Sequence, residues 1–214
     1  MNSFYNKIKV FLGIKEKEIN PILSLFLDKK CVFFHIPKTA GISISNSLFG
    51  GVKWGHRSVN FYKSHYGEKV FNSLYKFCFV RNPYDRLFSA YTFLKEGGIN
   101  NQDLEFSNSY LQEFASFDEF VLKGLEKEEI MNWVHFKPQY TFICDENDNI
   151  VMDFIGKMES LNTDFDTVCK HLKIESQLQK LNMSSSKKNE FSEEIKAMIK
   201  LKYQKDFNLF YPNL

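Results

Sequence analysis

Residues 31–44, CVFFHIPKTAGISI, carry the strongest structural signal in this 214-residue chain. The run CVFFHI (31–36) predicts a strand that is buried on both faces, as in a parallel sheet. Pro37 to Gly41 then predicts a loop, and residues 42–49 predict the start of a helix. Such a helix start presents unpaired N–H groups and the positive end of the helix dipole. The stretch therefore predicts a strand–loop–helix unit that is suited to bind an anion.

The side chains of this loop suit the same role. Lys38 adds a mobile positive charge, and Thr39 and Ser43 add hydroxyl donors. Small residues at positions 40 and 41 let the backbone come close to a ligand. The Walker A pattern GxxxxGK[ST] is absent. From the spacing alone, a plain strand–helix turn with a solvated lysine is the alternative interpretation.

A second loop lies in the stretch FVRNPYDRLFSAY, residues 79–91. Arg81 comes where a buried strand is predicted to end, which is where ligands bind in open α/β sheets. Ser89 lies about two turns into the helix predicted to follow, so the two side chains could reach one anion. The alternative is that Arg81 and Arg86 pair with Asp85 or with another acidic residue.

Composition bounds the possible classes of protein. Hydrophobic residues make up 43% of the chain and aromatic residues 16%, which excludes global disorder. The longest uncharged apolar stretch, residues 19–27, is too short for a membrane-spanning helix, and no secretion signal is evident. The four cysteines lie far apart without a CxxC pattern, so we expect buried thiols in a reducing compartment rather than a zinc site. We therefore expect a cytoplasmic protein without an integral membrane segment.

Charge is unevenly distributed along the chain. Residues 1–90 hold 14 Lys and Arg against 5 Asp and Glu, a net of +9, whereas residues 91–214 hold 14 against 21, a net of −7. Only three of the 28 basic residues are arginines, and all three lie within one 30-residue window: Arg57, Arg81 and Arg86. Arginine offers a planar fork for phosphate that lysine lacks. This half of the chain is therefore expected to attract an anion, with a mixed surface charge as the alternative.

The remaining pattern predicts alternating helices and strands in one domain. We expect helices over 4–14, 58–74, 82–97, 116–127, 163–172 and 192–206, a buried strand over 76–80, and a hairpin over 140–155. Asn82 and Pro83 mark one helix start, and Ser116 and Glu119 form a capping box. We predict an N-terminal helical extension (1–30) and a single domain (31–214). Its fold class is a three-layer α/β architecture with a mainly parallel central sheet flanked by helices.

The two loops together resemble the paired cofactor loops of sulfotransferases that use 3′-phosphoadenosine 5′-phosphosulfate (PAPS). The resemblance is to the carbohydrate-type branch, which includes uronosyl 2-O-sulfotransferases and small bacterial relatives. It continues through WGH (54–56), HFKPQ (135–139), DFIGKMESL (153–161), LN (181–182) and KDFNLFY (205–211). The resemblance covers residues 31–214 and implies a phosphate-binding loop like that of nucleotide kinases.

The resemblance also implies cofactor contacts. The 5′-phosphosulfate contacts are carried over to Lys38, Thr39, Ala40, Gly41 and Ser43. The 3′-phosphate contacts are carried over to Arg81 and Ser89. Ile42 departs from the family, which usually has a hydroxyl residue there, so only its backbone N–H remains for the phosphate. The polar loop 183–189 resembles a segment that closes over the nucleotide, with Lys187 as its expected contact.

The implied reaction is in-line transfer of a sulfuryl group from PAPS to an acceptor hydroxyl, with no metal required. The hydroxyl needs a base, and imidazole titrates near neutrality. His56 is the first candidate because related enzymes place a catalytic histidine between the two loops, and His65 is the second. Lys38 is expected to stabilise charge on the leaving phosphate. We expect His35 to be structural, His135 to line the acceptor cleft and His171 to lie on the surface.

The acceptor and the rival functions stay open at this point. The branch resembled acts mainly on sugars, so a saccharide or glycolipid is expected, with specificity in the divergent stretch 97–140. A nucleotide kinase-like phosphotransferase would need a Walker A loop and usually an aspartate for magnesium. A non-catalytic nucleotide-binding protein would keep Lys38 and Arg81 but lack a base. Nucleic acid is not an expected partner, because the basic excess is modest.

Overall fold

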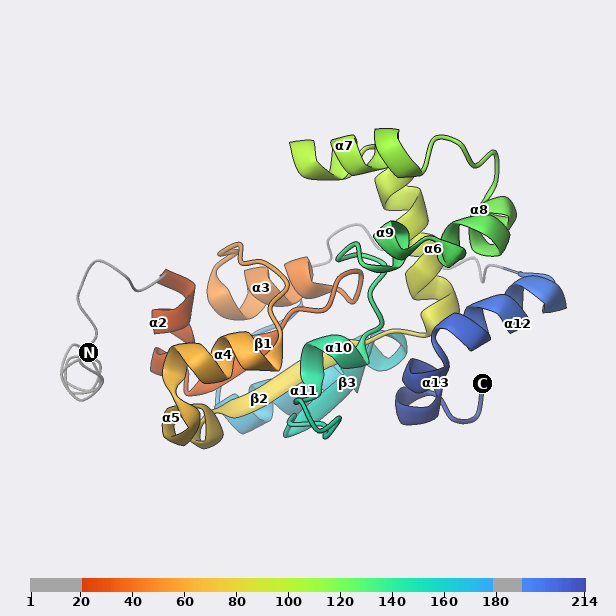
Figure 1. Ribbon diagram of the computed structural model, residues 1–214. Coiled ribbons are helices and arrows are strands. Elements are labelled where there is room, and N and C mark those ends of the chain that lie inside the picture. The colour runs from red at the N-terminus through yellow and green to blue at the C-terminus, as the bar shows by residue number, and fades with distance from the viewer. Residues whose placement is uncertain (1–20, 179–189) are drawn as a thin grey trace.

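The computed structural model describes residues 21–178 and 190–214, and within them three strands form one parallel sheet. The strands are β1 (Cys31–Phe34), β2 (Tyr75–Val80) and β3 (Phe154–Lys157), in the order β1-β2-β3 (Figure 1). Phe33 is in register with Phe77, which in turn pairs with Phe154. The two strands predicted from unbroken apolar runs are confirmed.

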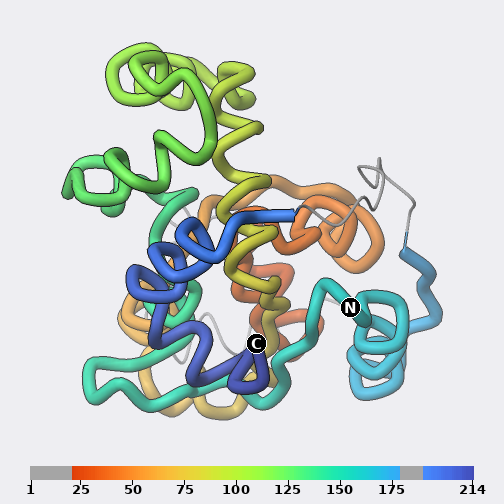
Figure 2. The backbone as a smooth tube through the Cα atoms, turned by 90° about the vertical axis from the view of Figure 1, so that its right-hand side faces the viewer, coloured from red at the N-terminus to blue at the C-terminus, as the bar shows by residue number. Residues whose placement is uncertain are grey.

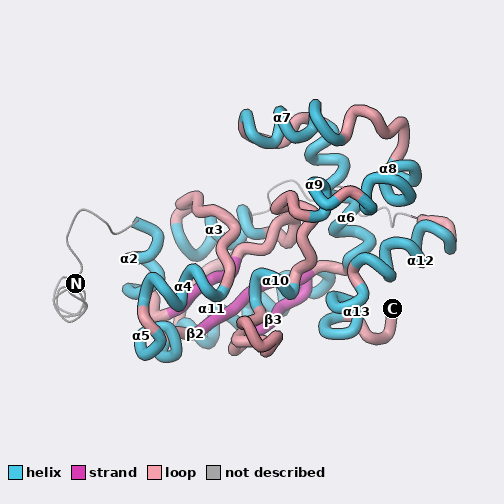
Figure 3. The backbone as a smooth tube through the Cα atoms, in the orientation of Figure 1, coloured by secondary structure: helices cyan, strands magenta, loops and turns pink. Residues whose placement is uncertain are grey.

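Helices cover both faces of this sheet, and β1 shows why. Neighbouring strand residues point to opposite faces. Phe33 meets Phe49 of the following helix at a ring distance of 6.3 Å, whereas Phe34 meets Tyr62 on the other side at 4.9 Å. Both phenylalanines are fully buried. The predicted α/β class is therefore confirmed as a small parallel sheet flanked by helices (Figure 3).

The helices of the described residues are mostly short. In chain order they are α2 (Pro21–Asp28), α3 (Gly41–Phe49), α4 (Val59–Tyr66), α5 (Glu68–Ser73), α6 (Pro83–Lys95), α7 (Asn101–Tyr110), α8 (Phe117–Lys123), α9 (Glu128–Met131), α10 (Tyr140–Ile143), α11 (Leu161–Leu172), α12 (Glu193–Lys202) and α13 (Gln204–Phe210), with 3-10 turns η1 (Gly124–Glu126) and η2 (Met158–Ser160). Helices α3 and α11 lie on one side of the sheet, and α4 and α5 lie on the other (Figures 1 and 2).

Helix α6 links the sheet to the helical part of the molecule. It begins as predicted, because the Asn82 side chain accepts a hydrogen bond from the N–H of Tyr84 and Pro83 occupies the first turn. It ends before Gly97 and Gly98, which both adopt positive φ. From there the chain leads to α7 and α8, and α12 packs back against α6 and α8 (Figure 2).

Two other predicted helix starts are also confirmed. Ser116 accepts a hydrogen bond from the N–H of Glu119 at the start of α8, and Ser192 accepts one from Ile195 at the start of α12. The predicted helix over 58–74 is two helices, because the chain breaks at Gly67 with φ 73°. The predicted helix over 4–14 lies outside the described residues.

The hairpin predicted over 140–155 is wrong. Residues 140–143 form helix α10, and antiparallel pairing is limited to an isolated bridge between Cys144 and Ile150. The second predicted strand, over 150–155, shares only its last two residues with β3, which pairs in parallel with β2. The physical reason is distant in sequence: the buried Asp206 carboxylate accepts hydrogen bonds from the N–H groups of Gln139 and Tyr140 and so fixes the start of a helical turn.

Helix α2 belongs to the core that surrounds β1. Its residues Ile22, Leu23 and Phe26 are buried, and Phe26 meets Phe49 edge-on at 5.2 Å. No helix in the described ranges is long and apolar enough to cross a membrane. All of the cysteines are buried free thiols, as predicted.

Candidate active site

The two loops singled out in the sequence meet at one edge of the sheet. β1 and β2 are adjacent parallel strands, with Phe34 in register with Cys78, so both loops leave from the carboxyl ends of their strands. A hydrogen bond of 3.4 Å from the Arg81 guanidinium to the Lys38 carbonyl joins them directly. The structure therefore brings together the two predicted anion-binding loops.

The first loop offers mainly backbone groups, rather than side chains, to a ligand. Lys38 and Ala40 adopt left-handed backbone angles, with φ 69° and 62°, which are uncommon for residues other than glycine. The Thr39 hydroxyl donates to the carbonyl of Ile36 at 2.9 Å, and its side chain is fully buried. That hydroxyl therefore stabilises the loop from within. The first N–H groups of α3, which begins at Gly41, have no carbonyl partner inside the helix.

Lys38 extends from this loop toward α6. Its Nζ lies 3.9 Å from the centre of the Phe93 ring, a cation–π contact. Burial lowers the pKa of Lys38 to about 8, and the charge of Arg81 acts in the same direction, while Asp103 and Glu96 oppose them. The ammonium group is therefore easier to deprotonate than an ordinary lysine, and a bound anion would favour its charged form.

The second loop presents Arg81, which is held at its backbone. The side chain of the fully buried Gln139 accepts from the Arg81 N–H and donates to the Arg81 carbonyl, both at 2.9 Å. The Arg81 side chain is half-buried, and burial lowers its pKa while Asp85 and Glu159 oppose that shift. Ser89, two turns along α6, is also half-buried. The backbone of this strand end is thus fixed, and the guanidinium remains at the edge of the site.

The hydrogen-bond partners of Arg86 are backbone carbonyls, and not Asp85 as considered from the sequence. Arg86 is 2% exposed, and its guanidinium donates to the carbonyls of Pro37, Lys137 and His135 at 3.0, 2.9 and 3.3 Å. One buried arginine thus ties the first loop to the segment before α10. It is part of the scaffold on which the site is built.

His56 is oriented for proton transfer. Its Nδ1 lies 2.7 Å from the carbonyl oxygen of His35. A carbonyl only accepts hydrogen bonds, so Nδ1 carries the proton and Nε2 keeps a free lone pair. Burial is the main cause that lowers the pKa of His56. The hydrogen bond to the His35 carbonyl opposes this shift, and the positive charges of Arg86, Arg57 and Lys38 add to it. The neutral form, which is the form a general base needs, is therefore favoured.

Two further histidines lie beside His56. The ring of His35 is centred 4.4 Å from that of His56, and the ring of His135 is centred 5.7 Å from that of His56. His135 is 9% exposed, and its Nε2 lies 3.4 Å from a carboxylate oxygen of the buried Asp103. Burial lowers the pKa values of His35 and His135 to about 3. The site thus contains a cluster of neutral imidazoles.

The other two histidines contact different parts of the molecule. His65 lies on α4, where its ring meets Tyr66 at 5.1 Å and stacks with Phe61 at 6.3 Å. His171 is an exposed residue of α11 and stacks on Tyr75 at 3.7 Å. Lys187, which was predicted to contact the nucleotide, lies outside the described residues.

Sequence reasoning missed Phe93, Gln139 and the scaffold role of Arg86. Gln139 falls within the HFKPQ stretch, whose resemblance hinted at importance without a role. Its N–H donates to Asp206 while its side chain holds Arg81, so it links the second loop to α13. Phe93 carries no sequence signal beyond its place one turn after Ser89.

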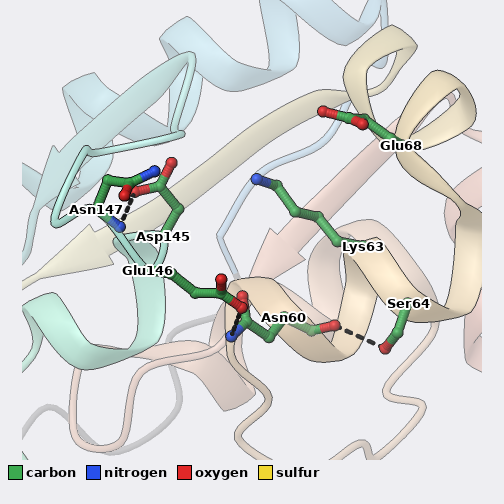
Figure 4. Close-up of a pocket in the computed structure, with 7 residues that line it drawn as sticks. All are labelled: Asn60, Lys63, Ser64, Glu68, Asp145, Glu146 and Asn147. Atoms are coloured by element: carbon green, nitrogen blue, oxygen red, sulfur yellow. Dashed lines mark hydrogen bonds between the residues drawn. The ribbon is translucent and has the colours of Figure 1, made fainter.

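An open depression lies elsewhere on the surface, between α4 and the turn at 145–147 (Figure 4). It is lined by Asn60, Lys63, Ser64, Glu68, Asp145, Glu146 and Asn147. Asn60 donates to Glu146 across it at 3.1 Å. None of these residues belongs to the two loops or to the histidine cluster, so this depression is distinct from the candidate site.

Comparison with known proteins agrees with this geometry. The chain matches the Sulfotransferase family over residues 26–212, and it belongs to that family. An uncharacterized protein of Archaeoglobus fulgidus is 30% identical over 115 residues, which is 52% of this chain and 78% of that protein. No solved structure matches the chain. The resemblance seen in the two loops is therefore confirmed, and the general reaction class is sulfuryl transfer.

Proposed function

We propose that this protein transfers the sulfuryl group of PAPS to a hydroxyl group of an acceptor and releases 3′-phosphoadenosine 5′-phosphate. The observation that carries the proposal is the meeting of two anion-binding loops beside an oriented histidine. Arg81 donates to the carbonyl of Lys38, and His56 hydrogen-bonds the carbonyl of His35 in the same loop. One short segment, residues 35–41, would thus contact both the cofactor and the base.

The residues present fit a nucleotide with two phosphate groups. The N–H groups at the start of α3, from Gly41 to Ser43, with Lys38, would hold the 5′-phosphosulfate. The Arg81 guanidinium and the Ser89 hydroxyl would hold the 3′-phosphate. Thr39 and Ala40 would contribute backbone, since the Thr39 hydroxyl is already bonded within the loop. Ile42 is 61% exposed, so its backbone N–H can approach a ligand although it lacks a hydroxyl.

PAPS would supply the sulfuryl group, and the residues of the chain would move one proton and stabilise one charge. His56 would accept the acceptor's hydroxyl proton at Nε2 as the new oxygen–sulfur bond forms. The bond between sulfur and the bridging phosphate oxygen breaks, and negative charge grows on that oxygen. Lys38 would stabilise this charge, an effect that is strong in a partly buried site. We propose that no divalent metal takes part.

We propose a saccharide or glycolipid as the acceptor. The divergent segment 97–140 lies beside the site, because His135 contacts His56 and lies close to Asp103 on α7. A nucleotide kinase-like phosphotransferase is not favoured by the family match. A purely nucleotide-binding role would leave the orientation of His56 without a purpose.

Ligand-dependent thermal unfolding tests the proposal. We expect 3′-phosphoadenosine 5′-phosphate, without divalent metal, to raise the melting temperature more than ADP or ATP with magnesium does. Saturation at 100 times the dissociation constant would add about 2.7 kcal/mol of stability. Incubation with labelled PAPS and a panel of hydroxyl acceptors, read by mass spectrometry, would then identify the acceptor. A larger shift with ATP and magnesium would favour a kinase instead.

A further inference from the structure

His35 occupies the space that a side chain at position 41 would need. A Cβ built on Gly41 would lie 1.9 Å from both Cδ2 and Nε2 of the His35 ring. Gly41 is the first residue of α3, and it has no positive φ that would itself call for glycine. The glycine is therefore required by the imidazole packed against it. The ring of His35 sets how the first turn of α3, with its free N–H groups, sits against the end of β1.

The backbone of the same residue holds the candidate base. The His35 carbonyl accepts the hydrogen bond from Nδ1 of His56 at 2.7 Å, and the two rings are centred 4.4 Å apart. A shift of His35 would therefore displace the lone pair that His56 presents. His35 touches both the phosphate-binding turn and the base, through different atoms.

The surroundings of His35 fix its ring and keep it neutral. The ring stacks on Phe33 at 5.9 Å, lies 6.1 Å from the ring of Trp54, and interacts with the Trp54 backbone. Burial, together with nearby His56 and His135, lowers its pKa to about 3. An imidazole that stays neutral at working pH acts by shape and hydrogen bonding. Its contact with Trp54 also joins it to the segment that carries His56, two residues further along the chain.

We propose that His35 is a positioning residue that aligns the phosphate-binding turn of α3 with His56. The ring sets the turn through Gly41, while its contact with Trp54 and the hydrogen bond that the His35 carbonyl accepts from His56 set the base. This inference rests on the proposed function, because it assumes that the turn binds the nucleotide and that His56 is the base. It assigns a functional role to a histidine that sequence reasoning takes as merely structural.

A size-swap experiment tests the contact with Gly41. His35→Ala leaves a gap, Gly41→Ala places a methyl group where the ring lies, and the double variant places that methyl group in the gap. Calorimetry would measure the affinity for 3′-phosphoadenosine 5′-phosphate. We expect each single variant to bind about tenfold more weakly and the double variant to recover most of that loss, since contacting residues are coupled.

The outcomes of this experiment separate the two proposals. If the losses multiply in the double variant, His35 does not set the turn, and the inference is overturned. If a single variant fails to fold, the melting temperature of the double variant becomes the readout, and failure to recover it also counts against the inference. If the unsubstituted chain does not bind this nucleotide, the proposed function itself fails.

A second variant tests the link to His56. His35→Phe keeps a planar ring against Gly41 but removes the ring nitrogens, which interact with the Trp54 backbone. We expect nucleotide affinity and the KM for PAPS to stay within about threefold of the native values, while kcat falls about tenfold or more. His171→Phe, on the exposed face of α11, is the matched control and should change neither. An unchanged kcat in His35→Phe would overturn the positioning of the base.

Discussion

The loops after β1 and β2 start at the same edge of one sheet, yet they leave different groups available to a ligand. The first loop turns its backbone outward through left-handed residues, while its Thr39 hydroxyl points inward. The second holds its backbone through Gln139 and leaves the Arg81 guanidinium at the site. If the first loop binds its ligand through backbone N–H groups, we expect it to tolerate the loss of a side-chain donor, such as the hydroxyl that Ile42 lacks. We expect a site that relies on the side chains of Arg81 and Ser89 to tolerate such a loss less well.

The largest expected effect concerns His56, the proposed base, which hydrogen-bonds the His35 carbonyl just before the first loop. His56→Ala should lower turnover by roughly 100–10,000-fold, because general base catalysis contributes about that much. Affinity for 3′-phosphoadenosine 5′-phosphate should stay nearly intact, since His56 faces the acceptor. Steady-state kinetics and calorimetry measure the two effects. His65→Ala on α4 is the matched control, and a large loss of turnover there with little loss in His56→Ala would reassign the base.

The next effect tests the charge on the first loop. Lys38→Ala should lower turnover by about 100–1,000-fold, because it removes a donor facing the charge that grows in the transition state. Unlike His56→Ala, it should also weaken nucleotide binding. Steady-state kinetics and calorimetry on the Lys38→Ala protein measure these two effects. Loss of binding without any loss of turnover at saturation would mean that Lys38 only holds the nucleotide.

The pH dependence of kcat/KM for the native protein should show the titration of both His56 and Lys38. His56 must be neutral, and its pKa is lowered, so kcat/KM should rise with pH along a limb below its ordinary value of about 6.5. Lys38 must be charged, and its pKa is about 8, so kcat/KM should fall as pH rises through that value. Lys38→Arg keeps the charge at high pH, so it should remove the alkaline limb. Persistence of that limb in Lys38→Arg would assign it to another group.

Arg81 and Arg86 provide the sharpest contrast within the second loop. Arg81→Ala should weaken binding of nucleotides with a 3′-phosphate on the order of 10–100-fold, the loss of a charge-assisted contact of about 1.5–3 kcal/mol. Nucleotides without that phosphate should be affected much less. Calorimetry with both nucleotide types measures the difference. Equal weakening for both would show that Arg81 maintains the fold rather than the contact.

The paired variant Arg86→Leu should act on stability instead. It should lower the free energy of unfolding by at least about 1–3 kcal/mol, the cost of leaving one buried carbonyl without a donor. Denaturant unfolding without ligand measures this loss. A fully stable Arg86→Leu protein that had lost only nucleotide binding would reverse the roles of the two arginines.

These two arginines also show what the sequence could and could not predict. Strands and helix caps follow from local patterns, because apolar runs and capping residues act over a few positions. The pairing of the two loops comes from the family resemblance. The burial of Arg86 depends on hydrogen bonds to carbonyls about fifty positions away, those of Pro37 and His135. No pattern around residue 86 encodes those partners.

The prediction of a hairpin over 140–155 fails for the same reason, since the structure there also depends on partners distant in sequence. The aromatic and β-branched residues of 140–144 suit a strand, and nothing local opposes it. Helix α10 forms because Asp206, in α13, accepts hydrogen bonds from the backbone of Gln139 and Tyr140. The bond between His35 and His56 likewise needs the fold, since a backbone carbonyl has no sequence signal. Long-range hydrogen bonds to the backbone are what pattern reasoning omits.

The smallest expected effect separates backbone from side chain within the first loop itself. Thr39→Val keeps the shape of a buried side chain but removes its hydrogen bond to the Ile36 carbonyl, so stability should fall by about 0.5–1.5 kcal/mol. Nucleotide affinity should change little, because the loop would offer the same N–H groups. Ser43→Ala, in the first turn of α3 and half-buried, should do the reverse, weakening the nucleotide a fewfold without loss of stability. Denaturant unfolding and calorimetry on both variants measure the pair. A Thr39→Val protein of native stability that bound the nucleotide weakly would show that the hydroxyl turns to the ligand, and the first loop would then resemble the second in relying on its side chains.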